Sequence, residues 1–112
     1  MPAITPITSD ELHRQILRRG TRAVVDFYQA SCAPCRALEP RLERIAGRYL
    51  GRVAAYRVDL DNDPDAAQRF DVLSLPTVLA IVDGQETARL DGLITDPQLQ
   101  QLFDQLAPEA RR

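Results

Sequence analysis

The feature that most constrains this chain is a strand-length apolar run that leads directly into a pair of cysteines. Residues 22–29, RAVVDFYQ, are rich in β-branched and aromatic side chains, and the only two cysteines, Cys32 and Cys35, follow soon after. Such a near-continuous run is typical of a central strand covered on both faces. Pro34 suits the first turn of a helix. The segment therefore predicts a buried strand, a short turn and a helix, with both cysteines at the turn.

The residues before this strand predict an extended segment and a helix. The N-terminal segment covers residues 1–8 and contains a short extended piece at 3–7, which Pro6 interrupts. A helix over about 9–19 follows it. Thr8 and Glu11 are predicted to form a capping box, and the helix is expected to stop at Gly20.

After the cysteines, the pattern alternates between helix and strand. The helix that begins at Pro34 is expected to kink at Pro40, and its apolar face comprises Leu38, Leu42, Ile45, Ala46 and Tyr49. Residues 52–60 read as a strand. Asp63 is expected to cap a short helix that starts with Pro64 and runs to about Phe70.

The C-terminal third predicts a hairpin and a last helix. Two β-rich runs in TVLAIVDGQETARL flank the pair Asp83-Gly84, which suits a two-residue turn. Asp96-Pro97 opens a helix whose apolar face comprises Leu99, Leu102, Phe103 and Leu106. The order β-α-β-α-β-α-β-β-α predicts an α/β protein with a mixed sheet, parallel in its first half and ending in an antiparallel hairpin.

Length, composition and charge limit the possible functions. With 112 residues, of which 45% are hydrophobic, we expect a single domain over 1–112 with a frayed tail at 108–112. The 14 basic and 16 acidic residues give a net charge of −2 without a basic block, so nucleic acid is not an expected partner.

The same reasoning predicts a cytoplasmic protein without a membrane partner. The N-terminal sequence lacks a signal-peptide pattern, and no apolar run approaches the roughly 18 residues of a membrane span. Because cytoplasmic thiols are kept reduced, a paired cysteine motif there is more often catalytic or metal-binding than structural.

The placement of the cysteines predicts different roles for the two thiols. At a helix N-terminus, unpaired amides and the helix dipole favour an anion and lower the pKa of the Cys32 thiol below its free value of about 8.5. The resulting thiolate is a nucleophile. Cys35, one turn further along, is expected to be shielded and to act as the resolving thiol.

The residues alone leave three other interpretations of the cysteine pair open. A structural disulfide would close a loop of only four residues, which the chain-entropy relation values at about 2 kcal/mol. A zinc site needs four ligands, and this chain offers two cysteines and one histidine, His13. Only a dimer that shares two C-x-x-C pairs would complete such a site. His13 itself is expected to be a solvated helix residue. The cysteines could also be inert neighbours, although their position between strand and helix disfavours this.

The chain resembles the thioredoxin family along essentially its whole length. The matching segments are VVDFY, CAPC followed by Arg36, Pro40, VDLDNDPDAAQRFDVLSLPT, the DG turn and Gly92 after the last strand. Their order and spacing imply the thioredoxin fold, a central mixed β-sheet flanked by helices on both faces. Relatives with altered redox function share this fold, so activity depends on the site residues.

The resemblance implies roles for particular residues. Cys32 corresponds to the attacking cysteine and Cys35 to the resolving one, while Pro76 is similar to the family's cis-proline, which holds the partner's extended chain beside Leu75. The full expected substrate-binding set is Ala33, Pro34, Leu75, Pro76, Gly92 and Leu93.

Asp26 matches the family's buried carboxylate behind the active site. A carboxylate that is desolvated between sheet and helix should have a raised pKa and could accept the Cys35 proton. The alternative is an aspartate at a solvated strand edge.

Several residues depart from the family pattern and are expected to modulate the site. Ser31 and Tyr28 occupy positions where thioredoxins usually carry tryptophan, and the chain contains no tryptophan. Ala33-Pro34 replaces the family's Gly-Pro between the cysteines. Arg57 replaces the lysine that accompanies the buried aspartate, and its permanent charge and forked donors should favour ionised Asp26.

These observations predict a thioredoxin-like protein-disulfide reductase that needs no metal or organic cofactor. The expected partners are disulfide-containing proteins and a thioredoxin reductase or other dithiol donor, and a monomer is expected. One alternative is an oxidant or isomerase that uses the same dithiol. Another is a redox-inactive binding module that holds extended segments in the groove around Pro76, Gly92 and Leu93.

Overall fold

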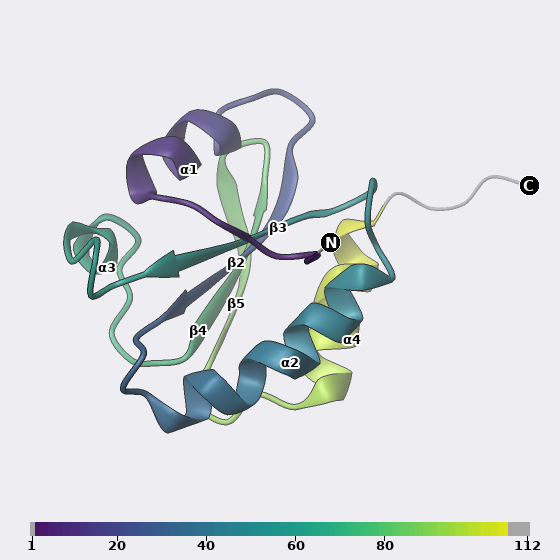
Figure 1. The fold of residues 1–112 in the computed structure, drawn as a ribbon. Helices are drawn as coiled ribbons and strands as arrows, with labels where there is room; N and C mark the ends of the chain where they lie inside the picture. The colour runs from purple at the N-terminus through teal and green to yellow at the C-terminus, as the bar shows by residue number, and fades with distance from the viewer. Residues whose placement is uncertain (1, 108–112) are drawn as a thin grey trace, which may run out of the picture.

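The computed structural model describes residues 2–107 and contains five strands and four helices in that range (Figure 1). In chain order they are β1 (Thr5–Pro6), α1 (Ser9–Ile16), β2 (Arg22–Tyr28), α2 (Ala33–Gly47), β3 (Ala54–Asp59), α3 (Asp65–Arg69), β4 (Thr77–Val82), β5 (Gln85–Asp91) and α4 (Asp96–Leu106). The expected order of elements is confirmed. The expected tail at 108–112 lies outside the described residues.

The strands form one mixed sheet in the order β1-β3-β2-β4-β5. β1 and β2 both pair in parallel with β3, whereas β4 runs antiparallel to β2 and to β5. β2 therefore lies at the centre of the sheet, as its near-continuous apolar sequence predicts.

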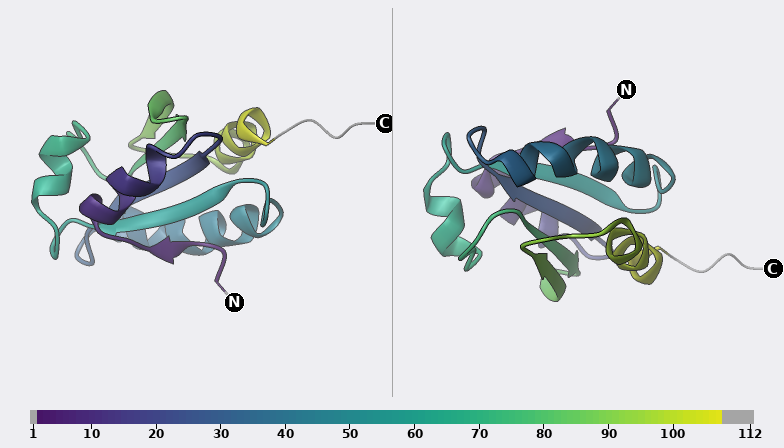
Figure 2. Two further views of the ribbon diagram at one scale, coloured as in Figure 1. Left: turned by 90° about the horizontal axis from the view of Figure 1, so that it is seen from above. Right: turned by 90° about the horizontal axis from the view of Figure 1, so that it is seen from below.

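Two apolar cores cover the two faces of this sheet. The side chains of alternate β2 residues point to opposite faces, so Val24 packs with α2 and α4 while Val25 and Phe27 pack with α1 and α3. Figures 1 and 2 show the same division, with α2 and α4 together on one side and α1 on the other. The predicted mixed sheet with helices on both faces is confirmed.

The turns at the sheet ends follow from backbone conformation. Asp83 and Gly84 both have positive φ, 51° and 83°, as the two central residues of a tight hairpin turn require. At the opposite end of β4, the Leu75–Pro76 peptide bond is cis, as the family resemblance implies.

Some predicted boundaries are wrong by a few residues. α1 ends at Ile16 rather than near residue 19, and the third strand covers Ala54–Asp59 rather than 52–60. Asp63 does not cap α3, because Pro64 occupies the N-cap position without a side-chain hydrogen bond. α2 begins at Ala33 rather than at Pro34, and Tyr49 lies just beyond its end at Gly47 but is still buried. Pro40 lies inside the helix, as expected, and the kink there stays a prediction.

Within the described range, no helix is both long enough and apolar enough to cross a membrane.

Candidate functional site

The two cysteines form a disulfide at the start of α2. Cys32 is the N-cap residue, and its Sγ accepts a hydrogen bond from the backbone N–H of Cys35 at 3.2 Å. The Cα atoms of the pair lie 5.2 Å apart. An N–H that points at Cys32 Sγ can also stabilise a thiolate there when the pair is reduced.

The two sulfurs differ in their access to solvent. Cys32 is partly exposed, whereas Cys35 has only 3% of its surface accessible. A partner disulfide can therefore approach Cys32, while Cys35 is shielded beneath it. This is the asymmetry that the strand–turn–helix pattern predicts.

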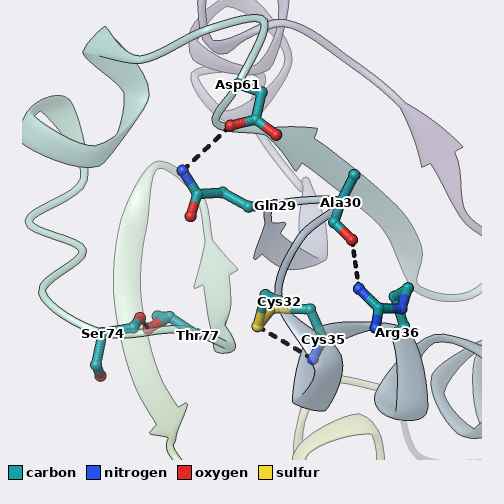
Figure 3. Close-up of a disulfide and its surroundings, with 8 residues drawn as sticks. All are labelled: Gln29, Ala30, Cys32, Cys35, Arg36, Asp61, Ser74 and Thr77. Atoms are coloured by element: carbon teal, nitrogen blue, oxygen red, sulfur yellow. Dashed lines mark hydrogen bonds between the residues drawn. A yellow bond between two sulfur atoms is a disulfide. The ribbon is translucent and has the colours of Figure 1, made fainter.

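The turn before Cys32 is fixed by side-chain and backbone hydrogen bonds. Cys32 N–H donates to Gln29 O at 3.1 Å. The Arg36 guanidinium donates to Ala30 O at 2.6 Å (Figure 3). Gln29 in turn donates to the Asp61 carboxylate at 3.2 Å. Because Arg36 belongs to α2, its bond to Ala30 O holds the turn against the start of that helix.

Asp26 is a buried carboxylate in the middle of β2. Only 3% of its surface is accessible, so the alternative of a solvated strand-edge aspartate is wrong. Burial raises the pKa of Asp26 from its ordinary 3.8 to about 7, and the nearby Arg57 charge opposes this shift only in part. Asp26 can therefore bind or release a proton near neutral pH.

A cavity of about 190 Å³ joins Asp26 to the second cysteine. Its lining includes Asp26 and Tyr28 from β2, Arg57 from β3, and Cys35 and Glu39 from α2, together with Ala30 and Arg36. The cavity places the carboxylate and the shielded sulfur around one space.

The charge of Arg57 acts on Asp26 in the expected direction, but its forked donors do not bind the Asp26 carboxylate. Its charge does lower the pKa of Asp26, but burial is the larger effect. The guanidinium fork binds other groups: it forms an ion pair with Glu39 and donates to the Tyr28 hydroxyl at 3.2 Å. Sequence reasoning missed Glu39, although a charged residue at i+4 from Cys35, on an apolar helix face, was an available signal.

The other expected binding residues gather at the same end of the sheet. Phe27 of β2 pairs with Thr77 of β4, so the turn after β2 and the cis-proline before β4 lie at the same end of the sheet. Gly92 N–H donates to Pro76 O at 3.2 Å, and this bond holds the segment after β5 at the same end of the sheet.

These expected binding residues differ in exposure. Leu93 is 93% exposed, and Ala33 and Pro34 at the start of α2 are also exposed. Leu75 is half-buried and Pro76 is buried. Sequence reasoning missed Leu73, an apolar residue that is 89% exposed in the loop before Pro76.

Ser31 and His13 are both exposed, and His13 is the solvated helix residue that was expected. Over residues 2–107, no group of three or more His, Cys, Asp or Glu side chains is arranged to hold a metal ion.

The fold and the site together define a class: α/β proteins with a mixed five-stranded sheet and a C-x-x-C disulfide at a helix N-terminus. The family model described as Thioredoxin matches residues 3–105 of the chain. The chain belongs to the thioredoxin family.

Individual relatives agree with this assignment. The chain is 31% identical to thioredoxin of Staphylococcus haemolyticus over 102 residues, covering 91% of this chain and 96% of that protein. It is 35% identical to mitochondrial thioredoxin of Mus musculus over 92 residues, or 82% of this chain, and spans only about half of that relative, 55%. The solved structure of a mutant thioredoxin from Halobacterium salinarum has the same fold, with a TM-score of 0.82, 24% identity and coverage of 96% and 94% of the two chains.

Proposed function

We propose that this protein is a thiol–disulfide oxidoreductase that reduces disulfide bonds in other proteins. The observation that carries the proposal is the Cys32–Cys35 disulfide at the start of α2, with one sulfur partly exposed and the other buried. Membership of the thioredoxin family supports the same chemistry. Cys32, Cys35 and Asp26 are the proposed catalytic residues.

The proposed reaction transfers two electrons to the partner. In the reduced protein, the Cys32 thiolate attacks one sulfur of the partner disulfide, forms a mixed disulfide and releases the other sulfur as a thiolate. Cys35 then loses its proton to Asp26 and attacks Cys32 Sγ, which expels the second partner thiolate. The partner leaves as a dithiol after its thiolates are protonated, and the protein is left with the Cys32–Cys35 disulfide. A dithiol donor, such as a thioredoxin reductase, restores the reduced form.

The proposed binding surface lies at the end of the sheet where α2 and β4 begin. It comprises Ala33, Pro34, Leu75, Pro76, Gly92 and Leu93. An extended partner segment would lie beside Leu75 and the cis-proline Pro76, in contact with Gly92 and Leu93. Ala33 and Pro34 would limit its approach to Cys32. The exposed leucines at this end of the sheet offer apolar surface to a partner chain.

We also propose that residues 1–112 form a single thioredoxin-like domain, which acts as a monomer in the cytoplasm. There it takes part in cell redox homeostasis and electron transport. The proposed reaction needs no metal or organic cofactor. Similarity to thioredoxin of Staphylococcus haemolyticus, which covers 91% of this chain and 96% of that protein, supports the single-domain part of this proposal.

The division of labour between the cysteines is tested by trapping. With Cys35 replaced, the mixed disulfide on Cys32 cannot be resolved, so Cys35→Ser should accumulate covalent complexes with partner proteins. Cys32→Ser should form few, because the remaining thiol is buried. The measurement is a non-reducing gel of tagged variants recovered from cells. Equal trapping by the two variants would contradict the assigned roles.

A further inference from the structure

Glu39 connects α2 to the charged residues behind the disulfide. It lies four residues after Cys35, so the two side chains share a helix face, and both line the cavity that contains Asp26. The Glu39 carboxylate forms an ion pair with the Arg57 guanidinium, and the side chains of Glu39 and Arg57 are 43% and 25% exposed. The ion pair therefore lies at the rim of the cavity, between its buried interior and solvent.

Strand register places Arg57 next to Asp26. The two residues are paired across the parallel strands β2 and β3, so their side chains point to the same face of the sheet, toward α2. Arg57 is therefore the cation best placed to pair with the buried carboxylate. Direct pairing with a guanidinium typically lowers the pKa of an aspartate by about 1 to 3 units.

The guanidinium is held by other partners instead. Besides the ion pair with Glu39, Arg57 donates to the Tyr28 hydroxyl at 3.2 Å and stacks over the Tyr28 ring, with its Cζ 4.7 Å from the ring centroid. Among residues 2–107, Asp26 Oδ1 and Arg57 Nε are the buried side-chain polar atoms without a hydrogen-bond partner. The two charged groups thus face one cavity without binding each other.

We propose that Glu39 is a positioning residue that holds the Arg57 guanidinium away from Asp26 and so keeps Asp26 able to accept the Cys35 proton. This inference rests on the proposed function, in which Asp26 assists the resolving step. It concerns a contact between α2 and β3 that lies outside the cysteine motif.

The remaining groups around Asp26 do not replace this contact. From α2, Cys35 and Arg36 also line the cavity, but Arg36 donates to Ala30 O. From β2, Tyr28 binds Arg57, and the β4 residue paired with Asp26 is the apolar Val78. Glu39 is therefore the anion in the cavity lining that competes with Asp26 for the guanidinium.

Removing the Glu39 charge has two effects of the same sign on Asp26. The guanidinium loses its ionic partner and becomes free to turn toward the buried carboxylate, and a negative charge disappears from the cavity rim. Both changes favour ionised Asp26 and lower its pKa. A weaker base that ionises at lower pH then assists Cys35.

The test is a pH titration of the Asp26 carboxyl carbon by NMR in the oxidised protein, where neither cysteine titrates. Glu39→Gln should lower the Asp26 midpoint by about 1 pH unit. Glu86→Gln is the matched control, because Glu86 on β5 also forms an ion pair with an arginine, Arg89, but does not line the cavity. An unchanged midpoint in Glu39→Gln, or an equal shift in the control, would overturn the proposal.

A second background separates positioning from a simple charge effect. In Arg57→Met there is no guanidinium to hold, so adding Glu39→Gln should move the Asp26 midpoint by less than half as much as in the parent protein. Equal shifts in the two backgrounds would mean that Glu39 acts only through its own charge, which would also overturn the positioning role.

Activity measurements distinguish this proposal from the function on which it rests. Insulin reduction with dithiothreitol as donor, followed between pH 5.5 and 8, should show a pH profile displaced toward lower pH in Glu39→Gln. If the parent protein reduces insulin but the two profiles coincide, the role of Glu39 fails and the reductase function stands. If the parent protein does not reduce insulin, the proposed function itself fails, whatever the titration shows.

Discussion

At the scale of single residues, the active-site region holds a carboxylate that destabilises the fold when it is ionised. Asp26 is buried in the middle of β2, and the guanidinium of Arg57, which lines the same cavity, is bound to Glu39 and Tyr28. Desolvation therefore outweighs attraction, and the pKa of Asp26 rises to about 7. An ionised carboxylate at this position therefore lowers the stability of the fold.

The stability of the oxidised protein should consequently fall as pH rises. Because the pKa of Asp26 is 3.8 in the unfolded chain and about 7 in the folded one, the folded state binds more protons between these values. The unfolding free energy should thus decrease from about pH 4 to pH 7, by at most about 4 kcal/mol from this residue. Urea unfolding of the oxidised protein at several pH values measures this.

Asp26→Asn is the control for that pH dependence. It should match the parent protein near pH 4, be more stable above pH 7, and lose most of the decline between them. A variant that is less stable than the parent protein at pH 8 would instead assign Asp26 a structural hydrogen-bonding role.

Local sequence was sufficient to predict some residues of the site but not others. Cys32, Cys35 and Asp26 lie in one segment whose pattern defines strand, turn and helix, so their surroundings follow from that segment. The Glu39–Arg57 ion pair joins α2 to β3, and Arg57 also has Asp26 beside it. Which carboxylate the guanidinium binds depends on side-chain geometry, which a residue pattern does not determine.

At the scale of secondary-structure elements, periodicity predicted which helices and strands form, whereas their ends depend on distant contacts. Asp63 illustrates the difference. It precedes Pro64, which suggested a cap for α3, but its carboxylate accepts the backbone N–H of Ser9 at 2.6 Å. Ser9 is the first residue of α1 and is buried, so Asp63 satisfies a donor that would otherwise lack a partner.

Asp63→Ala should therefore destabilise the protein by about 1 to 3 kcal/mol, because it leaves the buried Ser9 N–H unpaired. Asp65→Ala is the matched control: Asp65 is an exposed acidic residue in the first turn of α3, and its replacement should change stability by about 0.5 kcal/mol or less. Thermal or urea unfolding gives both values. Similar losses in the two variants would show that the Asp63–Ser9 contact contributes little.

At the scale of the whole molecule, the fold brings the segments of the proposed binding surface together at one end of the sheet. The antiparallel pairing of β2 and β4 brings the Cys32 turn and Pro76 to the same end of the sheet, and the Gly92–Pro76 hydrogen bond adds the segment after β5. Exposed Leu93 follows Gly92 directly. The residue that adjoins Cys32 at this end of the sheet is Ser31, where thioredoxins usually carry a tryptophan.

Ser31 should limit how well this protein docks with a thioredoxin reductase. Large rigid aromatic side chains commonly dominate binding at interface centres, often by about 2 kcal/mol or more, and the exposed Ser31 offers almost none of this surface. Ser31→Trp should therefore raise the kcat/KM of an NADPH-dependent thioredoxin reductase for this protein about tenfold or more, equivalent to about 1.4 kcal/mol. The rate with dithiothreitol should stay nearly unchanged, because a small dithiol needs little docking surface.

Steady-state NADPH consumption measures this effect, with Leu17→Trp as the control. Leu17 is 63% exposed and lies close to Gly84, in the turn between β4 and β5, at the end of the sheet opposite to Cys32. A tryptophan there adds the same aromatic surface without changing the proposed binding surface, so the kcat/KM of the reductase should not rise. If the Ser31 protein already matches Ser31→Trp, or if both tryptophan variants gain equally, the residue before Cys32 does not determine how this protein selects its electron donor.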